Sequence, residues 1–518
     1  MKELSDILSI TSSHTREQVT EGIQRWPKTL QECKSRASQF HSLQKYQQDN
    51  LSLTQSTQQS LQRLENDVKE LDSLLRDATE VEKEGYNQVC FRGTPWSALN
   101  SIPFALFLLS IYKSYIVPGF SIFLPFLSII MPYILLKSFY SIPLSVKEYV
   151  QILWRLWNGQ LIARSPEELL NPAPAPTKDP ITQLKSLIQN GWTLFTVAQT
   201  LWQPIQQARH FIKLDTNCLS LGDSILRVKR VANELQVGWG RWLPSWLPKW
   251  IELCPSGTRE AFAFVIDTPF WLKHILRSIG RFEVLFSLAT RPDVVSAEFL
   301  ESSEPVLMLK EFGDPSIPLS RRVMSSIRLG GGVREAKASH AILTGPNRGG
   351  KSSFLRGVLL NVVCAHAFGA AFVGRAQMTP FTWIADGMRL DDSPGEQSMF
   401  EREVAFGSAV AKKEGGCGLV LYDELFHSTN PPDAQRTSEL FCDRLWKKSN
   451  CLSIVSTHVY SLARSAPESV KKVCVGAWRM PNGKYIFSYK LHKGVCEVSS
   501  VDLLLKQFGL LNSAGSSL

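Results

Sequence analysis

The chain has 518 residues, more than one hydrophobic core usually supports, so its length predicts about three domains. An apolar share of 44% and a charged share of 20% are typical of globular proteins and exclude a disordered chain, a collagen-like chain or a multi-span transporter. Lys plus Arg is 57 and Asp plus Glu is 47, a surplus of +10 that attracts phosphate-rich polymers or anionic lipid. Residues 1–92 hold 12 basic and 14 acidic side chains, a balance of −2, so the basic character belongs to the rest of the chain.

Residues 1–92 are rich in Gln, Ser, Glu and Lys, which predicts a helical segment. Apolar residues recur in it at alternating spacings of three and four, at Leu61, Leu64, Val68, Leu71, Leu75 and Ala78. This short heptad seam is compatible with an intermolecular coiled coil and equally with helices of one chain that pack on each other.

Residues 93–146 carry only two charged side chains, Lys113 and Lys137. The uncharged stretches 93–112 and 114–136 are each about as long as a bilayer-spanning helix of roughly 20 residues. The dipeptide Pro118-Gly119 is typical of a turn. We therefore expect a membrane segment of two helices that form a hairpin and return both ends to the nucleotide-containing side, although a buried apolar helix pair of a soluble domain fits the same pattern. The sequence does not identify the membrane.

Residues 147–180 form a Pro-rich linker region that ends in NPAPAPTKDP, and a domain boundary is expected there. Residues 181–335 are predicted to form a mostly helical, lever-like core domain, because apolar residues recur at helical spacing in 181–213 and 261–300. Residues 336–518 form the last predicted domain and contain the motifs that carry chemistry.

A phosphate-binding loop is the strongest signal in the sequence. It fits GxxxxGK[ST], with an apolar run from Ala341 before it and a helix-like stretch after it. Its glycines let backbone N–H groups surround phosphate oxygens, and the helix adds its positive N-terminal end. Lys351 is expected to bind the β- and γ-phosphates, and Ser352 to ligate Mg²⁺. The predicted ATP-binding residues are Gly345, Pro346, Asn347, Arg348, Gly349, Gly350, Lys351, Ser352 and Ser353.

A second strand, Gly418–Tyr422, ends in the adjacent carboxylates Asp423 and Glu424. This is a Walker B pattern, in which Asp423 holds Mg²⁺ and Glu424 activates or orients the attacking water. A third apolar run leads into His458, which is predicted to sense the γ-phosphate. The expected catalytic residues are Glu424, Lys351 and His458, with ATP and Mg²⁺ as substrate and cofactor.

These motifs resemble the ATPase domain of the MutS family, the mismatch-repair ATPases related to ABC-type ATPases. GPNRGGKSS at 345–353 is similar to the family's GPNMGGKST, and DDSPGEQSMFEREV at 391–404 is similar to its DDL..GQSTFMVEM segment. DELFHSTNPPD at 423–433, STH at 456–458 and YKLHKGV at 489–495 resemble further family motifs. The resemblance covers about residues 335–510.

The resemblance implies an α/β P-loop ATPase domain of the ABC type that dimerises, as a homodimer or a heterodimer. It implies that Ser398 reaches the partner's γ-phosphate in trans. Phe426-His427-Ser428 replaces the family's Gly-Arg-Gly, and no Phe-x-Glu mismatch wedge can be placed, which puts communication between sites and mismatch recognition in doubt.

Two functions follow from this reading. The first is a MutS-like ATPase that hydrolyses ATP in a dimeric composite site, binds DNA and is tethered to a membrane through 93–146. The alternative is a membrane-bound mechanochemical or scaffold ATPase that acts on lipid or protein partners without DNA.

Overall fold

A computed structural model of the chain describes residues 2–10, 12–76, 79–93, 95–102, 104–157, 180–331, 338–388, 398–479, 485–498 and 505. The fold divides into two compact units. Unit 1 comprises Met1–Glu65, Leu235–Ser245 and His274–Leu518, and unit 2 comprises Asn66–Glu234 and Trp246–Lys273. The chain therefore passes from unit 1 into unit 2 and back twice, at 66–234 and at 246–273.

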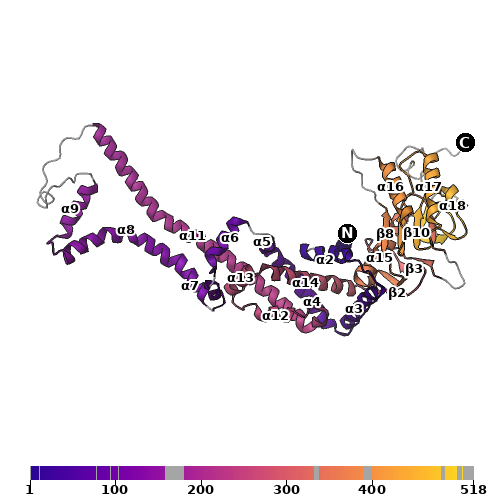
Figure 1. The fold of residues 1–518 in the computed structure, drawn as a ribbon, viewed down its shortest axis with the longest axis horizontal. Coiled ribbons are helices and arrows are strands. Elements are labelled where there is room, and N and C mark those ends of the chain that lie inside the picture. Colours follow the sequence, from indigo (N-terminus) through magenta and orange to yellow (C-terminus); the bar gives the residue numbers. More distant parts are fainter. Residues whose placement is uncertain are drawn as a thin grey trace. The chain divides into compact units, whose positions relative to one another are not determined.

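Unit 1 contains a six-stranded sheet in the order β12-β11-β5-β10-β9-β8 (Figure 1). The strands are β5 (His340–Thr344), β8 (Trp383–Gly387), β9 (Gly418–Tyr422), β10 (Cys451–Ser456), β11 (Val470–Arg479) and β12 (Tyr485–Lys493). The pairs from β11 to β8 are parallel, and β12 is antiparallel to β11. Every residue of β5, β9 and β10 is buried, as expected of parallel strands covered on both faces.

Helices cover both faces of this sheet. α15 (Lys351–Phe368) shares a hydrophobic cluster with Leu419 and Leu421 of β9. α17 (Pro431–Leu445) and α18 (Tyr460–Ser465) share a second cluster with Val420 and Tyr422 of the same strand. The alternation along β9 therefore divides the core into two layers.

Short strands form two further sheets in unit 1. β2 (Glu298–Phe299), β7 (Val373–Met378), β3 (Val306–Phe312) and β4 (Ser325–Gly330) pair in that order, and β1 (Val295–Ser296) pairs with β6 (Ala370–Ala371). The region 181–335, predicted to be mostly helical, is mostly helical as far as the end of α14 (Pro269–Ala289), and its last part, residues 295–330, contains strands instead. Strands within residues 295–330 form through pairing with β6 and β7, which follow α15 in the chain, and such long-range contacts cannot be deduced from local periodicity.

The N-terminal helices α1 (Lys2–Ile7), α2 (Ser13–Gln24) and α3 (Leu30–Asp49) belong to unit 1; α2 and α3 pack on α15, and α1 packs on α2. The indole Nε1–H of Trp26 donates to the carbonyl of Phe381 at 2.6 Å, and its ring stacks on His366 at 4.6 Å. Arg36 donates to the carbonyl of His366 at 2.9 Å. The first 50 residues are thus part of the same compact body as the ATPase motifs.

The predicted heptad seam lies mostly on α4 (Leu51–Glu70). Leu61, Leu64, Val68 and Leu71 are buried in the single chain, with Leu64 1% and Leu71 0% exposed, and Ala78 lies outside the described residues. Because the chain's own side chains already bury this seam, it is not available to a second chain. The helices of one chain packing on each other account for the pattern.

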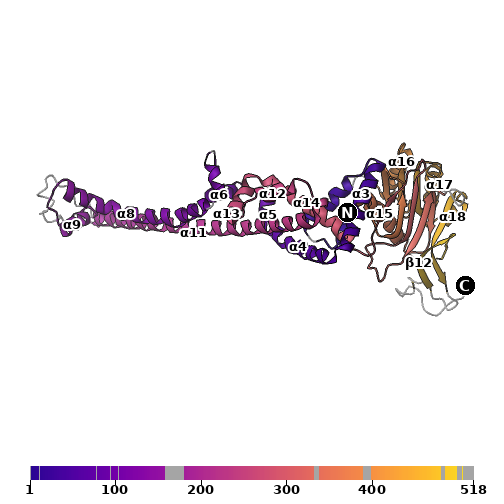
Figure 2. The same cartoon turned by 90° about the horizontal axis from the view of Figure 1, so that it is seen from below.

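Unit 2 consists of helices (Figure 2). In chain order its described elements are α5 (Asp72–Leu75), α6 (Glu80–Val89), η1 (Trp96–Ser101), α7 (Ala105–Ile111), η2 (Tyr112–Ile116), α8 (Val117–Ile134), η3 (Leu135–Phe139), α9 (Val146–Trp157), the larger part of α11 (Pro180–Trp239), α12 (Leu247–Leu253) and α13 (Thr258–Asp267). The helix η4 (Gly240–Trp242) belongs to unit 1. Of the predicted linker 147–180, α9 takes the first part and residues 158–179 lie outside the described residues.

The predicted turn at Pro118-Gly119 is wrong, because α7, η2, α8 and η3 form one helical run from Ala105 to Phe139. The wider π-helical turn of η2 directly precedes Pro118, and Val117 N donates to Tyr112 O five residues earlier. Such a turn relieves the clash between a proline ring and the preceding turn, so the helix continues. In the described part of the chain this run is the one helix long and apolar enough to cross a membrane, and 0% of its most apolar window is buried.

Candidate functional site

The carboxyl ends of β5, β9 and β10 meet at one edge of the six-stranded sheet, because the three strands pair in parallel. The loop 345–350 follows β5, Asp423 and Glu424 follow β9, and His458 follows β10. Ligands of open parallel sheets bind at this edge. The predicted phosphate-binding and catalytic residues, far apart in the sequence, are therefore neighbours.

The loop between β5 and α15 adopts a backbone that needs glycine. Gly345 has φ 148° and Gly350 has φ 101°, and a Cβ on Gly349 would lie 2.9 Å from the carbonyl oxygen of Pro346. These positions let the loop turn back on itself before the first turn of α15. Its backbone amides and the N-terminus of an 18-residue helix form an anion-binding cradle.

Lys351 is 4% exposed at the centre of this cradle. Its Nζ donates to the carbonyls of Gly345 at 3.0 Å and Pro346 at 3.3 Å and lies 3.1 Å from Nε2 of His458. Burial lowers the pKa of the ammonium, and the nearby carboxylates Glu424 and Asp423 act against this shift. The cation is held by weak neutral acceptors that a phosphate can replace.

Asp423 and Glu424 share one buried hydroxyl group, that of Ser456. Ser456 Oγ donates to Asp423 Oδ1 at 2.5 Å and accepts from the backbone N–H of Glu424 at 2.8 Å. Ser456 is 0% exposed, and Glu424 has φ 55°, a left-handed conformation that costs a non-glycine residue free energy. The hydroxyl therefore holds the chain in the bend that separates the two carboxylates.

His458 contacts both Lys351 and Glu424 through the same ring nitrogen. Nε2 lies 3.1 Å from Nζ of Lys351 and 3.2 Å from Oε1 of Glu424. The hydrogen bond from His458 is the main cause that lowers the pKa of Glu424. The carboxylate is therefore ionised near neutral pH, as a water-activating group must be.

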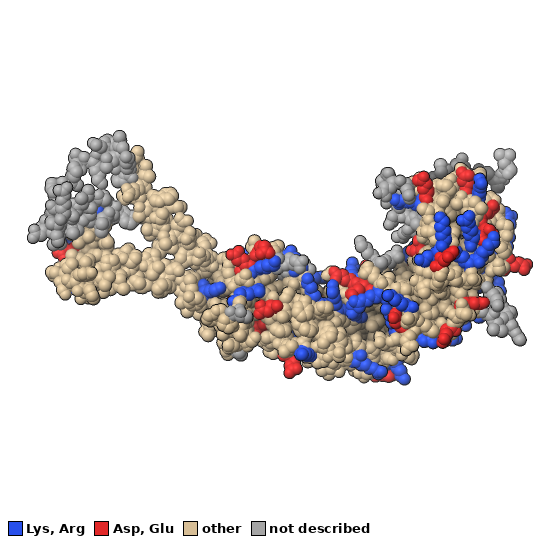
Figure 3. Space-filling model, in the orientation of Figure 1, with Lys and Arg blue, Asp and Glu red and all other residues tan. Residues whose placement is uncertain are grey.

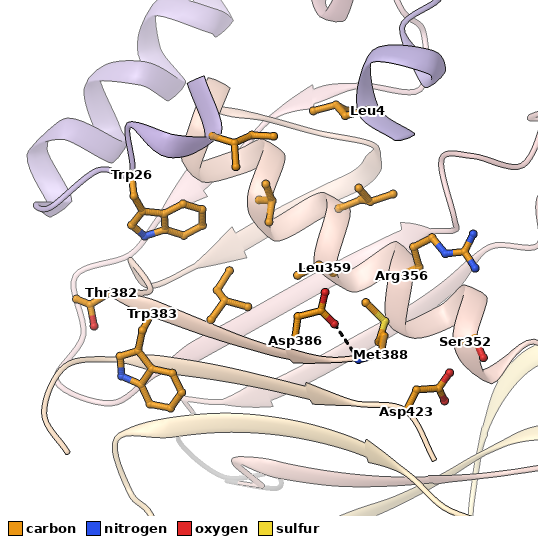
Figure 4. A pocket seen from close by; sticks show the side chains of 14 residues that line it. Leu4, Trp26, Ser352, Arg356, Leu359, Thr382, Trp383, Asp386, Met388 and Asp423 are labelled. Atoms are coloured by element: carbon orange, nitrogen blue, oxygen red, sulfur yellow. Dashed lines mark hydrogen bonds between the residues drawn. The ribbon is translucent and has the colours of Figure 1, made fainter. Parts of the chain in front are cut away.

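Ser352 and Asp423 lie at the same end of a pocket (Figure 4). Ser352 is exposed and Asp423 half-buried, so both side chains are accessible. A hydroxyl and a carboxylate are hard oxygen ligands, the kind that Mg²⁺ prefers beside phosphate. This donor set fits the predicted metal site.

On the other side of the loop, a second pocket of about 380 Å³ is lined by Asn347, Arg348, Gly350, Lys351, Ser353 and Glu424. Its opposite wall comes from residues 312–325 and Tyr489. Arg322 fixes this wall, because its guanidinium contacts Asp293 at 2.7 Å and donates to the carbonyl of Ile317 at 3.0 Å. Phe312, Ile317 and Tyr489 give the pocket an apolar and aromatic lining that suits a nucleoside.

Ser398 does not line either pocket beside the loop. It is the N-cap of α16 (Met399–Lys412), where its hydroxyl accepts from Glu401 N at 3.2 Å and its backbone N–H donates to the Glu401 carboxylate at 2.8 Å. Residues 389–397, which carry most of the segment before it, lie outside the described residues. Ser398 is exposed at a helix start and separate from the loop of its own chain.

The same helix is linked to the Walker B turn through Glu403, which is 1% exposed. Its carboxylate accepts from Ser428 Oγ at 3.1 Å and lies 2.9 Å from Nδ1 of His427. His427 and Ser428 are two of the residues at which the chain departs from the Gly-Arg-Gly pattern. This contact gives α16 a direct connection to the segment after Glu424.

Sequence reasoning assigned no role to Ser456, Arg322 or Glu403. Ser456 stands directly before Thr457-His458, and a polar residue at the end of an all-buried strand was the available signal. Arg322 and Glu403 act through partners 29 and 24 to 25 positions away, and no local pattern marks them.

Residues 341–504 match the family model described as MutS domain V. The chain is also similar to DNA mismatch repair protein MSH6 of Arabidopsis thaliana, at 27% identity over 248 residues, which are 44% of this chain and 18% of that protein. DNA mismatch repair protein MutS of Leuconostoc mesenteroides is 24% identical over 242 residues, 44% of this chain and 27% of that protein. DNA mismatch repair protein MSH3 of Pyricularia oryzae is 34% identical over 127 residues, 24% of this chain and 11% of that protein.

These comparisons show that the C-terminal part of the chain is similar to MutS domain V and to MutS and MSH proteins. The matched region is a mixed α/β domain of P-loop ATPase type, preceded by a helical N-terminal region. The chain matches less than a third of the length of each of these relatives.

Proposed function

We propose that this protein is a MutS-type ATPase that hydrolyses ATP at the edge formed by β5, β9 and β10 and couples the reaction to DNA. The observation that supports this most strongly is the joint contact of Lys351, His458 and Glu424, with Ser456 joining Glu424 to Asp423. A cation, two carboxylates and a histidine beside a glycine-rich loop form a set suited to phosphoryl transfer to water.

The contacts of His458 suggest how phosphate binding prepares the site. One ring nitrogen cannot accept from the ammonium of Lys351 and donate to Glu424 at the same time. When a phosphate draws Nζ of Lys351 away from the ring, Nε2–H is free to donate to Glu424 Oε1. Glu424 then receives a fixed orientation only after the nucleotide has bound.

Glu424 orients the attacking water and accepts its proton, while Lys351 stabilises the negative charge that the phosphate oxygens carry. Ser352 and Asp423 hold Mg²⁺, which when bound neutralises charge on the phosphates. Ile317 and Tyr489, which are accessible in the second pocket, contact the nucleoside. Each role follows from the side chain's chemistry and its place in the two pockets.

The proposal includes a dimer, homomeric or heteromeric, in which Ser398 of one chain completes the site of the other. Ser398 is exposed, stands at the positive end of a 14-residue helix and lies outside its own chain's pockets, as a contact in trans requires. The link from α16 through Glu403 to His427 gives such a contact a route to Glu424.

DNA is the proposed partner because the similar relatives are named DNA mismatch repair proteins. The net charge of +10 favours contacts with phosphate groups. The exposed apolar run Ala105–Phe139 supports tethering to a membrane, on whose nucleotide-containing side the ATPase domain stands. The alternative of a scaffold ATPase that ignores DNA is not favoured by these relatives.

The test is the rate of phosphate release by the full chain in lipid nanodiscs, with no DNA and with duplex, mismatched or branched DNA, at two salt concentrations. We expect at least one DNA to raise the rate, and more strongly at low salt, because phosphate contacts are screened by ions. A steady rate that rises with anionic lipid and ignores every DNA would move the assignment to the lipid- or protein-directed alternative.

A further inference from the structure

The connectivity of unit 1 limits how the chain can meet a membrane. Unit 1 contains residues from both ends of the chain, Met1–Glu65 and His274–Leu518. They are joined by specific contacts, such as Thr15 Oγ1 to Glu283 at 2.6 Å and Gln47 to the carbonyl of Phe286 at 3.2 Å. One compact body lies on one side of a bilayer. A chain that crosses once in unit 2 must therefore cross back before it returns to unit 1.

The first apolar leg lies within the run Ala105–Phe139. Between Lys113 and Lys137 it has 23 consecutive residues, 114–136, without Asp, Glu, Lys or Arg. Large side chains face outward along it, including Phe120 at 62%, Phe123 at 55% and Ile130 at 46% exposure. At 1.5 Å per residue the leg is about 35 Å long, enough for a hydrocarbon core of about 30 Å.

The N-terminal part of α11 forms a second leg of the same length, which is less apolar than the first and is assigned by its exposure and by the return of the chain to unit 1, not by composition alone. Between Lys185 and Arg209 it also has 23 consecutive uncharged residues, 186–208. Apolar side chains stand exposed on it, with Leu187 at 71%, Trp192 at 68% and Phe195 at 59%. On the face seen in Figure 3, the described surface of both legs shows neither Lys or Arg nor Asp or Glu. We call residues 105–157 and 186–208 the arm.

Three threonines of the second leg satisfy their hydroxyl groups within the helix. The hydroxyl of Thr193 donates to the carbonyl of Gln189 at 2.7 Å, and that of Thr196 to the carbonyl of Thr193 at 2.8 Å. Thr200 donates to the carbonyl of Thr196 at 2.5 Å. Hydroxyls that bond back to the helix backbone are satisfied inside a lipid bilayer.

The two legs end at one level within unit 2. Nζ of Lys113 lies 5.7 Å from the ring centroid of Phe211, three residues beyond the end of the second leg, and donates to the carbonyl of Gln88 at 2.5 Å. Ser110 donates to Asp215 at 2.9 Å, and Asp215 pairs with Arg259 at 2.6 Å. Charged side chains gather at this base and are absent from the legs, as at a membrane surface.

We propose that residues 186–208 of α11 are the second membrane crossing, so that lipid hydrocarbon covers both legs and α9 lies at the opposite face of the bilayer. The proposal rests on the membrane tether of the proposed function and replaces the predicted hairpin of 93–112 and 114–136. Residues 93–112 do not form a separate crossing, because α7 (Ala105–Ile111) continues without a turn into the first leg, as part of the single helical run Ala105–Phe139. At the far end, α9 exposes Val146 and Val150 beside the charged Lys147, a pattern suited to the interface.

The test uses the full chain in sealed vesicles with a membrane-impermeant maleimide. Single cysteines are introduced at exposed positions before, between and after the legs, as Glu84→Cys, Lys147→Cys and Arg230→Cys. The wild type serves as the blank, since nine of its ten thiols are buried. We expect Glu84→Cys and Arg230→Cys to react together from one side, and Lys147→Cys to react about tenfold more slowly until the membrane is permeabilised.

A charged residue in the second leg sharpens the test. Val197→Arg places a cation near the middle of the leg, where it opposes insertion. Val237→Arg is the matched control, because Val237 is an exposed valine of the same helix beyond the base, at 83% exposure. We expect Val197→Arg to remove the protection of Lys147→Cys and Val237→Arg to leave it unchanged.

Equal labelling of the three cysteines before permeabilisation would overturn the proposal, as would protection that survives Val197→Arg. A chain that leaves the membrane fraction and instead forms a dimer through the arm would assign the apolar surface to a second copy. Repeating the labelling with Lys351→Ala separates the two proposals, because topology is expected to be the same in a chain that no longer hydrolyses ATP.

Discussion

At the carboxyl edge of β5, β9 and β10, polar side chains are paired with one another, whereas along the arm apolar side chains face outward. Ser456 satisfies two groups at once and is 0% exposed, while Phe120 on the first leg is 62% exposed. At the sheet edge, the polar side chains find their hydrogen-bond partners within the same chain. The exposed apolar side chains of the arm require contact with another apolar surface that this chain does not supply. A substitution at the sheet edge should therefore change catalysis, and a substitution on the arm should change how the protein inserts into the membrane.

The largest effect at the sheet edge is expected from Lys351→Ala. It removes the one ammonium group that the structure places inside the glycine-rich loop, so ATP affinity should be lost and turnover should fall by about 10²- to 10³-fold. Equilibrium binding of a fluorescent ATP analogue and phosphate release measure the two effects. Lys447→Ala, in an exposed ion pair with Asp443, is the control and should change neither. Normal ATP affinity in Lys351→Ala would contradict the assignment of the loop.

Glu424→Gln separates binding from chemistry. The amide cannot accept the proton of water, so turnover should fall by about 10²- to 10⁴-fold while ATP remains bound. Light scattering should then show an ATP-dependent dimer that persists, since hydrolysis no longer releases it. A monomer at saturating ATP would contradict the composite site with Ser398 in trans.

Ser456→Ala tests whether the hydroxyl positions the two carboxylates. We expect turnover to fall by about tenfold with little change in ATP affinity, and stability to fall by about 1–3 kcal/mol, because Asp423 Oδ1 and the N–H of Glu424 lose their partner. Ser438→Ala is the matched control: Ser438 is also 0% exposed, and its hydroxyl has no hydrogen-bond partner within the described residues. Equal effects of the two substitutions would remove the positioning role.

The smallest effect is a pH dependence of stability that involves His340. Burial lowers its pKa from 6.5 to about 4, while a hydrogen bond to the carbonyl of Lys448 acts in the opposite direction. The folded imidazole stays neutral where the unfolded one is protonated. Its contribution to stability is therefore complete above about pH 6.5 and is lost as the pH falls toward 4.

Thermal unfolding of the wild type and of His340→Gln between pH 4 and 7 measures this contribution. The slope of stability against pH should be smaller in the variant by at most about 1.4 kcal/mol per pH unit, the value for one proton. An unchanged slope would show that His340 is not held neutral in the folded chain.

The residues at the sheet edge could be predicted from sequence because each motif joins a buried strand directly to its functional side chain. The loop before Lys351 and the pair Asp423-Glu424 are local patterns, and parallel pairing brings them together. Ser456 and Arg322 could not be predicted, since their roles come from partners that only the folded sheet brings near.

The other differences between the sequence-based predictions and the structure also arise from contacts that the local sequence does not show. Pro118-Gly119 resembles a turn, but the π-helical turn before it lets the helix continue. Apolar periodicity in 181–213 indicated a helix without showing that its neighbours leave it exposed. The contact of Trp26 with Phe381 joins segments 355 positions apart, so a truncated chain that begins at residue 180 would lack part of the ATPase body.

The most direct test of the central claim is a single-turnover measurement with radiolabelled ATP and Mg²⁺, comparing the full-length wild type with Glu424→Gln and Lys447→Ala. We expect the wild type and Lys447→Ala to convert bound ATP to ADP and phosphate, and Glu424→Gln to retain ATP unhydrolysed for about 10²-fold longer or more. Hydrolysis by Glu424→Gln at the wild-type rate, or no ATP bound by the wild type, would contradict the account.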